Sequence, residues 1–233
     1  PTRRSSDLAY CFRWGGSGYI APPSLEVAYS RRTSRGSSSG SYAAIQLPSE
    51  GTRRVKDWPT RAKVWALKYL RLSEVSSYGF EWVDTNGGRV VLPVKDSGGE
   101  LIGYQLRKIN EEDTGPKYIT RKAKGVPFYY YLEHEDSDTI VIVEDIVSAI
   151  VLHRYGYSTI ALLGTSATEE VVNVCMHYPK NVVWLDYDNP RVKRKQRALV
   201  DKLGLLTHSV LVTTEYDPKA ATEEQARKEI DDV

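Results

Sequence analysis

The second half of the chain alternates short apolar runs with longer amphipathic segments. Two of the runs, Thr139-Ile-Val-Ile-Val143 and Asn181-Val-Val-Trp-Leu185, are rich in β-branched residues, which is typical of strands buried on both faces. The predicted order is strand 139–143, helix 146–155, strand 158–163, helix 167–178, strand 181–185, helix 190–203, strand 208–213 and helix 223–231. Strands that alternate with helices in this way predict a parallel sheet.

The preceding region has a different pattern. From about residue 60, apolar side chains recur every three to four positions, which predicts a short helix. These side chains are Ala62, Trp65, Ala66, Tyr69 and Leu70. Two predicted strands, 89–94 and 101–107, flank the turn-rich segment 95–100, which fits a hairpin loop. The fold class is therefore predicted as α/β, with a parallel-sheet domain preceded by a smaller α+β subdomain.

Local signals support two of the predicted helix starts. Ser166-x-x-Glu169 and Thr222-x-x-Gln225 have the spacing of a capping box. In that motif the side chain of the first residue accepts a hydrogen bond from a free backbone N–H of the first turn. The side chain of the fourth residue accepts one from the backbone N–H of the first. Both positions therefore predict helix N-termini.

A segment rich in Ser, Gly and Arg divides the chain. Residues 31–42 have no apolar periodicity, and their composition is that of a flexible linker. We therefore expect a basic N-terminal arm and linker at 1–42, the α+β subdomain at 43–135 and the parallel-sheet domain at 136–233.

Composition narrows the class of protein. The chain is 41% hydrophobic and 27% charged, as in an ordinary soluble protein, and no apolar run approaches the roughly 18 residues that a membrane span needs. Its two cysteines, Cys11 and Cys175, are too far apart in sequence to suggest a disulfide framework. We expect no contact with a membrane and a reducing cytoplasm as the compartment.

The net charge of +2 hides an uneven distribution. Residues 1–60 hold nine Lys/Arg against four Asp/Glu, a net charge of +5, which leaves −3 for residues 61–233. A basic N-terminal region suggests an anionic partner such as nucleic acid, although a solvated, disordered arm would have the same composition.

Acidic residues follow two of the predicted strands. Glu144 and Asp145 come after strand 139–143, and Asp186 and Asp188 come after strand 181–185. Carboxyl ends of parallel strands meet at one edge of a sheet, so three carboxylates, those of Glu144, Asp186 and Asp188, would converge there and offer oxygen ligands to Mg²⁺ or Mn²⁺. The alternative for each is to cap the helix that follows, which is the interpretation we favour for Asp145.

These motifs resemble the Toprim domain of primases, topoisomerases and some nucleases. The matching segments are Val141-Ile-Val-Glu-Asp-Ile-Val-Ser-Ala149, Ala161-Leu-Leu-Gly-Thr-Ser166 and Val183-Trp-Leu-Asp-Tyr-Asp188. The resemblance implies that Glu144 serves in acid-base chemistry or as a metal ligand, and that Asp186 and Asp188 bind metal.

The middle region resembles the subdomain that precedes Toprim in bacterial and phage primases. The segments that carry this likeness are Gly88-Arg-Val-Val-Leu-Pro-Val94, Gly98-Gly-Glu-Leu-Ile-Gly-Tyr-Gln-Leu-Arg107 and Gly115-Pro-Lys-Tyr-Ile-Thr120. By this resemblance Arg107, Lys117 and Tyr118 would face the template strand or an incoming nucleotide. Without the resemblance, Arg107 and Lys117 would be interpreted as ordinary surface charges.

A third acidic motif departs from the family pattern. Asp217-Pro-Lys219 resembles the last acidic motif of primase-type Toprim domains, which makes Asp217 a further candidate metal ligand. Lys219 stands where many cellular primases have a second acid, so the likeness leans towards phage enzymes and assigns Lys219 to nucleotide binding. Ser148 also replaces a frequent Asp, which reduces the capacity for a second metal ion.

Two basic stretches are candidate nucleic-acid contacts. The predicted helix after Pro190 opens with Arg191, Lys193, Arg194, Lys195 and Arg197, an arrangement that opposes the helix dipole unless an anion binds. The other contains Arg121, Lys122 and Lys124 followed by Phe128-Tyr-Tyr-Tyr131. Basic and aromatic side chains together suit backbone contacts and base stacking; a solvated helix face and a strand are the alternatives.

The N-terminus resembles a degenerate zinc ribbon. Tyr10-Cys-Phe-Arg-Trp-Gly-Gly-Ser-Gly18 has Trp14 in place of a second cysteine. Structural zinc needs four N or S ligands, and residues 1–30 offer one cysteine and no histidine. We expect no zinc.

Together these features predict a stand-alone, phage-like DNA primase that makes short RNA primers on single-stranded DNA with Mg²⁺ or Mn²⁺. Its partners would be the template, ribonucleoside triphosphates and a replicative helicase or polymerase. Two alternatives stay open: a Toprim nuclease, and a catalytically weakened relative that binds DNA or protein and regulates replication or transcription.

Overall fold

The computed structural model describes residues 45–110, 114–164, 166–186, 190–204, 207–214 and 216–232, apart from the side chains of Asn86, Pro190 and Arg191. These residues belong to one compact unit, residues 39–233. The predicted N-terminal arm at 1–42, with its zinc-ribbon likeness, lies outside the described residues. No helix in the described ranges is long and apolar enough to cross a membrane.

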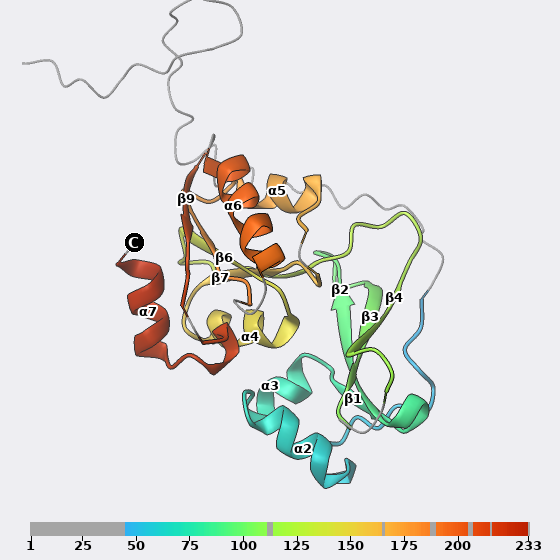
Figure 1. The fold of residues 1–233 in the computed structure, drawn as a ribbon. Coiled ribbons are helices and arrows are strands. Elements are labelled where there is room, and N and C mark those ends of the chain that lie inside the picture. Colours follow the sequence, from blue (N-terminus) through green and yellow to red (C-terminus); the bar gives the residue numbers. More distant parts are fainter. Residues whose placement is uncertain are drawn as a thin grey trace, which may run out of the picture. The chain divides into compact units, whose positions relative to one another are not determined.

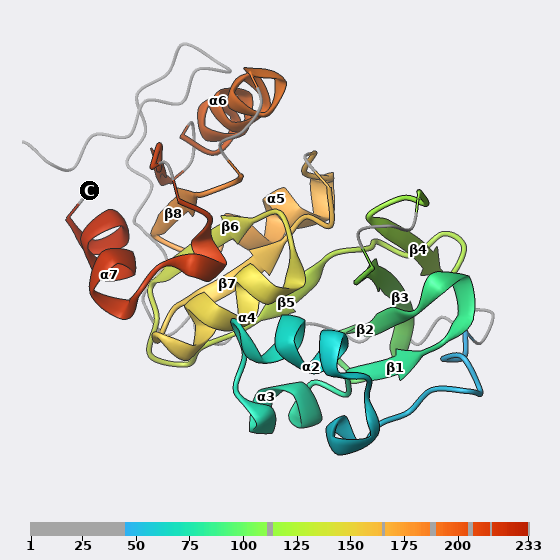
Figure 2. The same ribbon diagram turned by 60° about the horizontal axis from the view of Figure 1, so that its bottom comes forward.

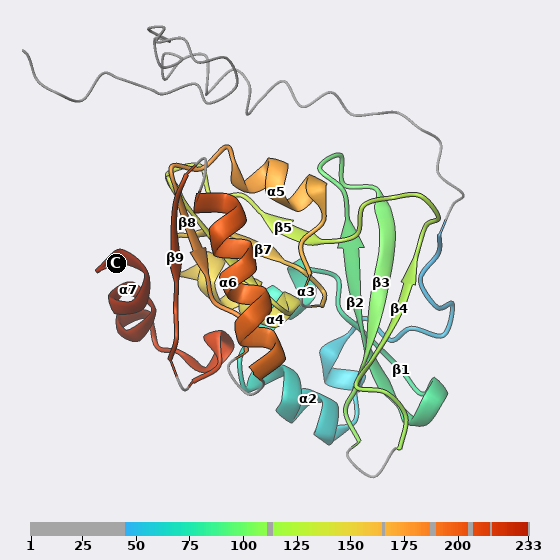
Figure 3. The same ribbon diagram turned by 45° about the horizontal axis from the view of Figure 1, so that its top comes forward.

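The first sheet is antiparallel. It contains β1 (Glu81–Val83), β2 (Arg89–Lys95), β3 (Leu101–Lys108) and β4 (Tyr118–Lys122) in the order β1-β2-β3-β4, and Figure 3 shows β2, β3 and β4 side by side. The predicted hairpin between β2 and β3 is confirmed. Arg89 is buried on β2 and donates hydrogen bonds to the carbonyls of Leu106 at 3.4 Å and Pro116 at 2.9 Å, which fixes the backbone that leads into β4.

Short helices accompany this sheet. Three precede it, η1 (Val55–Asp57), α2 (Thr60–Leu67) and α3 (Leu72–Ser77), and η2 (Thr85–Gly87) connects β1 to β2. Helix α2 confirms the predicted helix, and its Ala62 and Ala66 are buried in a core with Trp58 and Phe80. Burial of this apolar face, rather than a cap, holds the short helix, since its N-cap residue makes no side-chain capping bond.

The second sheet is mostly parallel, as predicted. Its strands are β5 (Tyr130–Leu132), β6 (Thr139–Val143), β7 (Ser158–Ala161), β8 (Lys180–Val183) and β9 (His208–Leu211) in the order β5-β7-β6-β8-β9. Strands β7, β6, β8 and β9 are parallel, and β5 pairs antiparallel with β7 at one edge.

Helices cover both faces of the parallel sheet (Figure 1). They are α4 (Ile146–Arg154), α5 (Glu169–Cys175), α6 (Pro190–Gly204) and α7 (Glu223–Asp231), with the short helix η3 (Pro218–Ala220) before α7. Alternate residues of β6 serve the two faces, because Val141 belongs to the core that α4 and α7 share, and Ile142 to the core that α5 and α6 share. The predicted α/β class is confirmed.

The tyrosine-rich segment forms β5 rather than a stacking surface. Tyr130 is buried and lies edge-on to Tyr78, with 6.4 Å between ring centroids. The hydroxyl of Tyr131 shares a hydrogen bond with that of Tyr178. The suggested base stacking is therefore wrong for Tyr130. By its pairing β5 also belongs to the second sheet, although it precedes the predicted boundary at residue 136.

Candidate metal centre and nucleic-acid interface

Three carboxylates converge at one edge of the parallel sheet. Asp145 follows β6, Asp186 lies beyond the end of β8, and Asp217 directly precedes η3. One ligand oxygen from each lies within 4.8 Å of the others. The carboxyl ends of neighbouring parallel strands place Asp145 and Asp186 together. The sequence predicted this edge of the sheet, but named Glu144 rather than Asp145 as the ligand that follows β6. Carboxylate oxygens at this spacing form a donor set for a hard cation.

Asp145 caps α4, as predicted. Its Oδ1 accepts a hydrogen bond from the backbone N–H of Ser148 at 3.0 Å, and its Oδ2 accepts one from the Ser148 hydroxyl at 3.2 Å. The sequence interpretation stopped at this capping role, whereas the side chain also joins the acidic group. The signal for the second role was its position beside Glu144 at the end of a buried strand.

Asp186 carries the strongest indication that the acidic group binds a cation. Burial, then the nearby Asp217 carboxylate, raise its pKa to about 6, and the charge of Lys219 opposes the shift. Among the described residues, its buried Oδ1 has no hydrogen-bond partner. A buried acceptor without a partner is costly, and a divalent cation would supply one. The residues therefore fit Mg²⁺ or Mn²⁺.

Lys219 lies inside the acidic group. Its Nζ is 3.2 Å from Asp145 Oδ2 and also forms an ion pair with Asp217 Oδ2. Burial alone would lower the pKa of Lys219, but the carboxylates of Asp145 and Asp217 outweigh it and raise that pKa above its usual range. The ammonium is therefore charged at physiological pH. Its predicted contact with nucleotide stays a prediction.

Glu144 and Asp188 were the other predicted ligands. Asp188 lies outside the described residues. The backbone carbonyl of Glu144 accepts a hydrogen bond from the N–H of Leu163 at 3.0 Å, and its side chain is half-buried. Glu144 is not one of the three residues whose oxygens converge. Its assignment to catalysis and metal binding stays a prediction.

Residues of the first sheet lie within electrostatic reach of these acids. The Arg107 guanidinium lies between two rings, 5.8 Å from the centroid of Trp65 and 5.1 Å from that of Tyr118. Burial, then the Asp145 carboxylate, raise the pKa of Tyr118. The positive charge of the exposed Lys117 opposes the rise in the pKa of Asp186, although burial and the charge of Asp217 outweigh it. Electrostatic interactions thus link Tyr118 and Lys117 to the carboxylates, and Arg107 contacts Tyr118.

The remaining predicted cations are mostly exposed. Arg121, Lys122 and Lys124 are solvent-exposed on β4 and directly after it, and Arg194 is exposed on α6, while Lys193 there is half-buried. The side chain of Arg191 lies outside the described residues. These positions leave the cations accessible to a polyanion, and their contacts with nucleic acid stay predictions.

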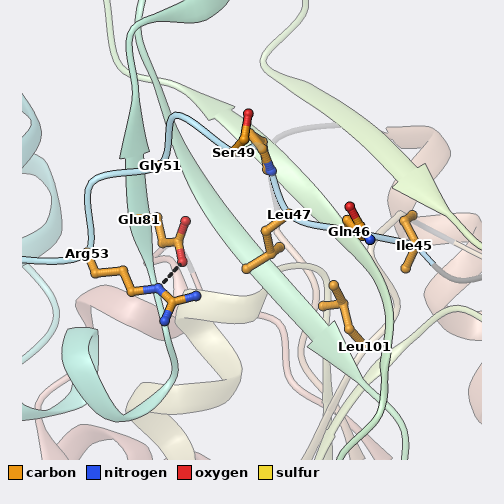
Figure 4. A pocket seen from close by; sticks show the side chains of 9 residues that line it. Ile45, Gln46, Leu47, Ser49, Gly51, Arg53, Glu81 and Leu101 are labelled. Carbon is orange, nitrogen blue, oxygen red and sulfur yellow. Dashed lines mark hydrogen bonds and ion pairs between the residues drawn. The ribbon is translucent and has the colours of Figure 1, made fainter.

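A separate pocket opens beside the first sheet (Figure 4). It is lined by Ile45, Gln46, Leu47, Pro48, Ser49, Gly51, Arg53, Glu81 and Leu101. The Arg53 Nε lies 2.7 Å from a carboxylate oxygen of Glu81. None of the residues of the acidic group lines this pocket.

The described residues combine a mostly parallel α/β sheet, which has an acidic edge, with an antiparallel subdomain, and this is the predicted fold class. No family model matches the chain. The DNA primase of Clostridium acetobutylicum is 34% identical over 109 residues, which cover 43% of this chain and 18% of that protein. The DNA primase of Aquifex aeolicus is 28% identical over 156 residues, covering 61% of this chain and 31% of the relative.

Solved structures share the fold. A DNA primase domain from Pseudomonas aeruginosa matches with a TM-score of 0.59 and 17% identity, over 75% of this chain and 71% of that one. A DnaG primase catalytic domain bound to single-stranded DNA matches with a TM-score of 0.59 and 16% identity, over 76% and 72%. These comparisons confirm the predicted resemblance to bacterial primases, and the sequence matches span less than a third of the relatives' length.

Proposed function

We propose that this chain is the catalytic core of a DNA primase, which joins ribonucleotides on a single-stranded DNA template to make short RNA primers. The observation that carries the proposal is the convergence of the Asp145, Asp186 and Asp217 carboxylates at one edge of the parallel sheet, where Asp186 Oδ1 has no hydrogen-bond partner among the described residues. A cation site facing basic and aromatic residues is the arrangement that nucleotidyl transfer needs. The primase names of the sequence relatives support it.

Asp145, Asp186 and Asp217 would hold Mg²⁺ or Mn²⁺, with Asp188 and Glu144 as the further ligands or acid-base group that the sequence predicts. A bound divalent ion would neutralise triphosphate charge and favour in-line attack by a 3′ hydroxyl. Arg107 and Lys117 would bind phosphate oxygens, and Arg107 has the firmer orientation because two rings flank it.

The template would follow the exposed cations on the two subdomains. We assign Arg121, Lys122 and Lys124, together with Arg191, Lys193 and Arg194, to contacts with the phosphate backbone. We assign Lys219 to the nucleotide side of the site. Ribonucleoside triphosphates are the proposed substrates, a replicative helicase or polymerase is the proposed protein partner, and the cytoplasm of a bacterial or phage-infected cell is the proposed compartment.

Primer synthesis tests the proposal. The full chain is incubated with single-stranded DNA of mixed sequence, labelled ribonucleotides and either Mg²⁺ or Mn²⁺. We expect short RNA products from the wild type, and a loss of about 100-fold or more in Asp186→Asn and Glu144→Gln. Asp136→Asn and Glu135→Gln change exposed carboxylates in the same way and are expected to keep full activity.

The outcomes separate the alternatives. The absence of RNA from the wild type with both metals, with and without a helicase, would contradict the proposal. Degraded template in that case would indicate a nuclease, and bound but intact template would indicate a regulatory relative.

A further inference from the structure

The Lys219 ammonium is held at the centre of the acidic group by three neighbours. Asp145 and Asp217 are its ion-pair partners, and the Tyr69 ring centroid lies 5.9 Å from its Nζ. Only 17% of the side chain is exposed. The position is also fixed from the backbone, because Asp217 Oδ1 accepts a hydrogen bond from the Lys219 N–H at 3.2 Å. A charged group placed with this many contacts is a built part of the site.

The lone pairs of two carboxylates are largely used within the chain. Asp145 binds the Ser148 N–H with Oδ1, and the Ser148 hydroxyl and Lys219 with Oδ2. Asp217 binds the Lys219 N–H with Oδ1 and the ammonium with Oδ2. Asp186, in contrast, keeps its buried Oδ1 without a partner among the described residues. Ligand capacity is therefore concentrated on the Asp186 side of the group.

Ser148 adds a second donor between the same carboxylates. Its hydroxyl lies 3.2 Å from Asp145 Oδ2 and 3.5 Å from Asp217 Oδ1. A hydroxyl that donates here brings no negative charge. Two-metal sites hold their ions about 3.5–4 Å apart. Here Lys219 and Ser148 contact the carboxylates of Asp145 and Asp217, which a second ion would need as ligands.

The formal charge of the three converging carboxylates and Lys219 also favours a single divalent ion. Asp145, Asp186 and Asp217 contribute −3 when ionised and Lys219 contributes +1, so the group carries −2. One divalent cation neutralises that charge. A second divalent cation bound to Asp145 and Asp217 would lie beside the half-buried Lys219 ammonium, which Coulomb repulsion between the two cations disfavours.

We infer that the Lys219 ammonium takes the place of a second divalent ion, so that the acidic group binds one Mg²⁺ or Mn²⁺ per chain and uses lysine as its permanent second cation. This inference rests on the proposed function only in assuming that the acidic group binds a divalent ion. It makes Lys219 a positioning residue that orients Asp145 and Asp217 around the single ion, to which Asp186 supplies its unpartnered oxygen.

Metal stoichiometry tests the inference without any assay of activity. The full chain is titrated with Mn²⁺, and bound ions are counted by calorimetry and by the electron paramagnetic resonance signal of free Mn²⁺. We expect one ion for the wild type and for Lys219→Arg, which keeps the charge. We expect two ions for Lys219→Asp, with the broadened spectrum of a coupled Mn²⁺ pair. Lys228→Asp, at an exposed position of α7, is the matched control and should bind one.

Two results would overturn the inference: two ions on the wild type, or a single ion on folded Lys219→Asp. If Lys219→Asp does not fold, the Lys219→Asp/Ser148→Asp double variant, with a ligand set of carboxylates alone, is titrated, and a single ion there is equally contradictory. If neither variant folds, the wild-type count decides between one ion and two. A wild type that binds no ion would overturn the metal-dependent part of the proposed function as well, whereas two ions would overturn this inference alone.

Discussion

The guanidinium of Arg154 on α4 forms a two-point ion pair with the carboxylate of Glu74 on α3. Arg154 Nε lies 2.7 Å from Glu74 Oε1, and Nη2 lies 2.5 Å from Oε2 and 2.9 Å from the backbone carbonyl of Tyr69. Glu74 also accepts a hydrogen bond from the backbone N–H of Arg71 at the start of α3. Figure 2 shows the two helices beside each other. One charged pair thus ties the helices of the first subdomain to the parallel-sheet domain.

Glu74→Gln should destabilise the fold because Arg154 is left mostly buried without its charge partner. The two side chains are 16% and 15% exposed. We expect the free energy of unfolding to fall by about 1–3 kcal/mol, measured by urea denaturation at pH 7. Glu135→Gln, at an exposed position, should change it by less than about 0.5 kcal/mol. Equal stabilities of wild type and Glu74→Gln would show that the pair is not a structural tie.

The same pair should make stability depend on pH. Burial alone would raise the pKa of Glu74, but hydrogen bonds from Arg154 and Arg71 outweigh it and hold the pKa below its usual value of 4.5. A carboxyl with a lowered pKa in the folded state contributes stability above 4.5 that is lost as the pH falls below it. The difference in unfolding free energy between wild type and Glu74→Gln should therefore shrink between pH 7 and pH 3. A constant difference across that range would contradict this account.

Mn²⁺ should stabilise the wild type through Asp186. An ion that binds only the folded state raises the free energy of unfolding by about 2.7 kcal/mol at 100 times its dissociation constant, so the melting temperature should rise with added Mn²⁺. In Asp186→Asn, which removes the carboxylate with the unpartnered oxygen, the rise should be mostly lost. Asp136→Asn is the control for an isosteric change at an exposed carboxylate. An undiminished shift in Asp186→Asn would place the metal elsewhere.

Trp65 should affect catalysis through Arg107. The guanidinium lies between the rings of Trp65 and Tyr118, and removing one ring frees it to rotate. We expect Trp65→Leu to raise the KM for ribonucleotides or the Kd for template by about 3–10-fold, with a smaller change in kcat. Arg107→Lys, which keeps the charge but loses the planar stack, should give a similar increase. If Trp65→Leu lowers kcat alone, the aromatic contact does not orient Arg107 for binding.

The exposed cations on β4 and directly after it should set the salt dependence of DNA binding. Each of Arg121→Gln, Lys122→Gln and Lys124→Gln is expected to reduce the slope of log K against log salt by about 0.7 for single-stranded DNA, if that side chain neutralises one phosphate. Fluorescence anisotropy at several salt concentrations measures the slope. Lys228→Gln on α7 is the control and should leave it unchanged. An unaltered slope in all three variants would remove this stretch from the interface.

Most of the parallel-sheet domain could be predicted because its strands are short β-branched runs between polar segments. Strand 139–143 was predicted with the observed bounds, and helix 190–203 differs by one residue from Pro190–Gly204. Strand β5 was predicted only as an alternative to a base-stacking surface, since three residues in a run of aromatic side chains carry no clear period. The start of α5 was also misplaced. Thr168, not Ser166, caps it, because local spacing alone cannot decide between two hydroxyl residues so close together.

The location of the acidic site, at one edge of the parallel sheet, could be predicted from the sequence, but the contacts between its side chains could not. Strand ends identified where the acids would meet, and Asp186 and Asp217 do converge. The contribution of Asp145 to the acidic group was missed because its capping of α4 was already a sufficient reason for an acid at this position. Lys219 was assigned to nucleotide from a family position. Its ion pair with Asp217 is local, two residues away, but its ion pair with Asp145 depends on tertiary packing of η3 that no local pattern encodes.

The most direct test of the central claim is the sequence of the RNA that the full chain makes. A single-stranded DNA of defined sequence is incubated with all four ribonucleotides and Mg²⁺, and the short products are sequenced. The account predicts RNA that is complementary to the template and absent when Asp186→Asn replaces the wild type. RNA unrelated to the template, or no RNA with either Mg²⁺ or Mn²⁺, would contradict it.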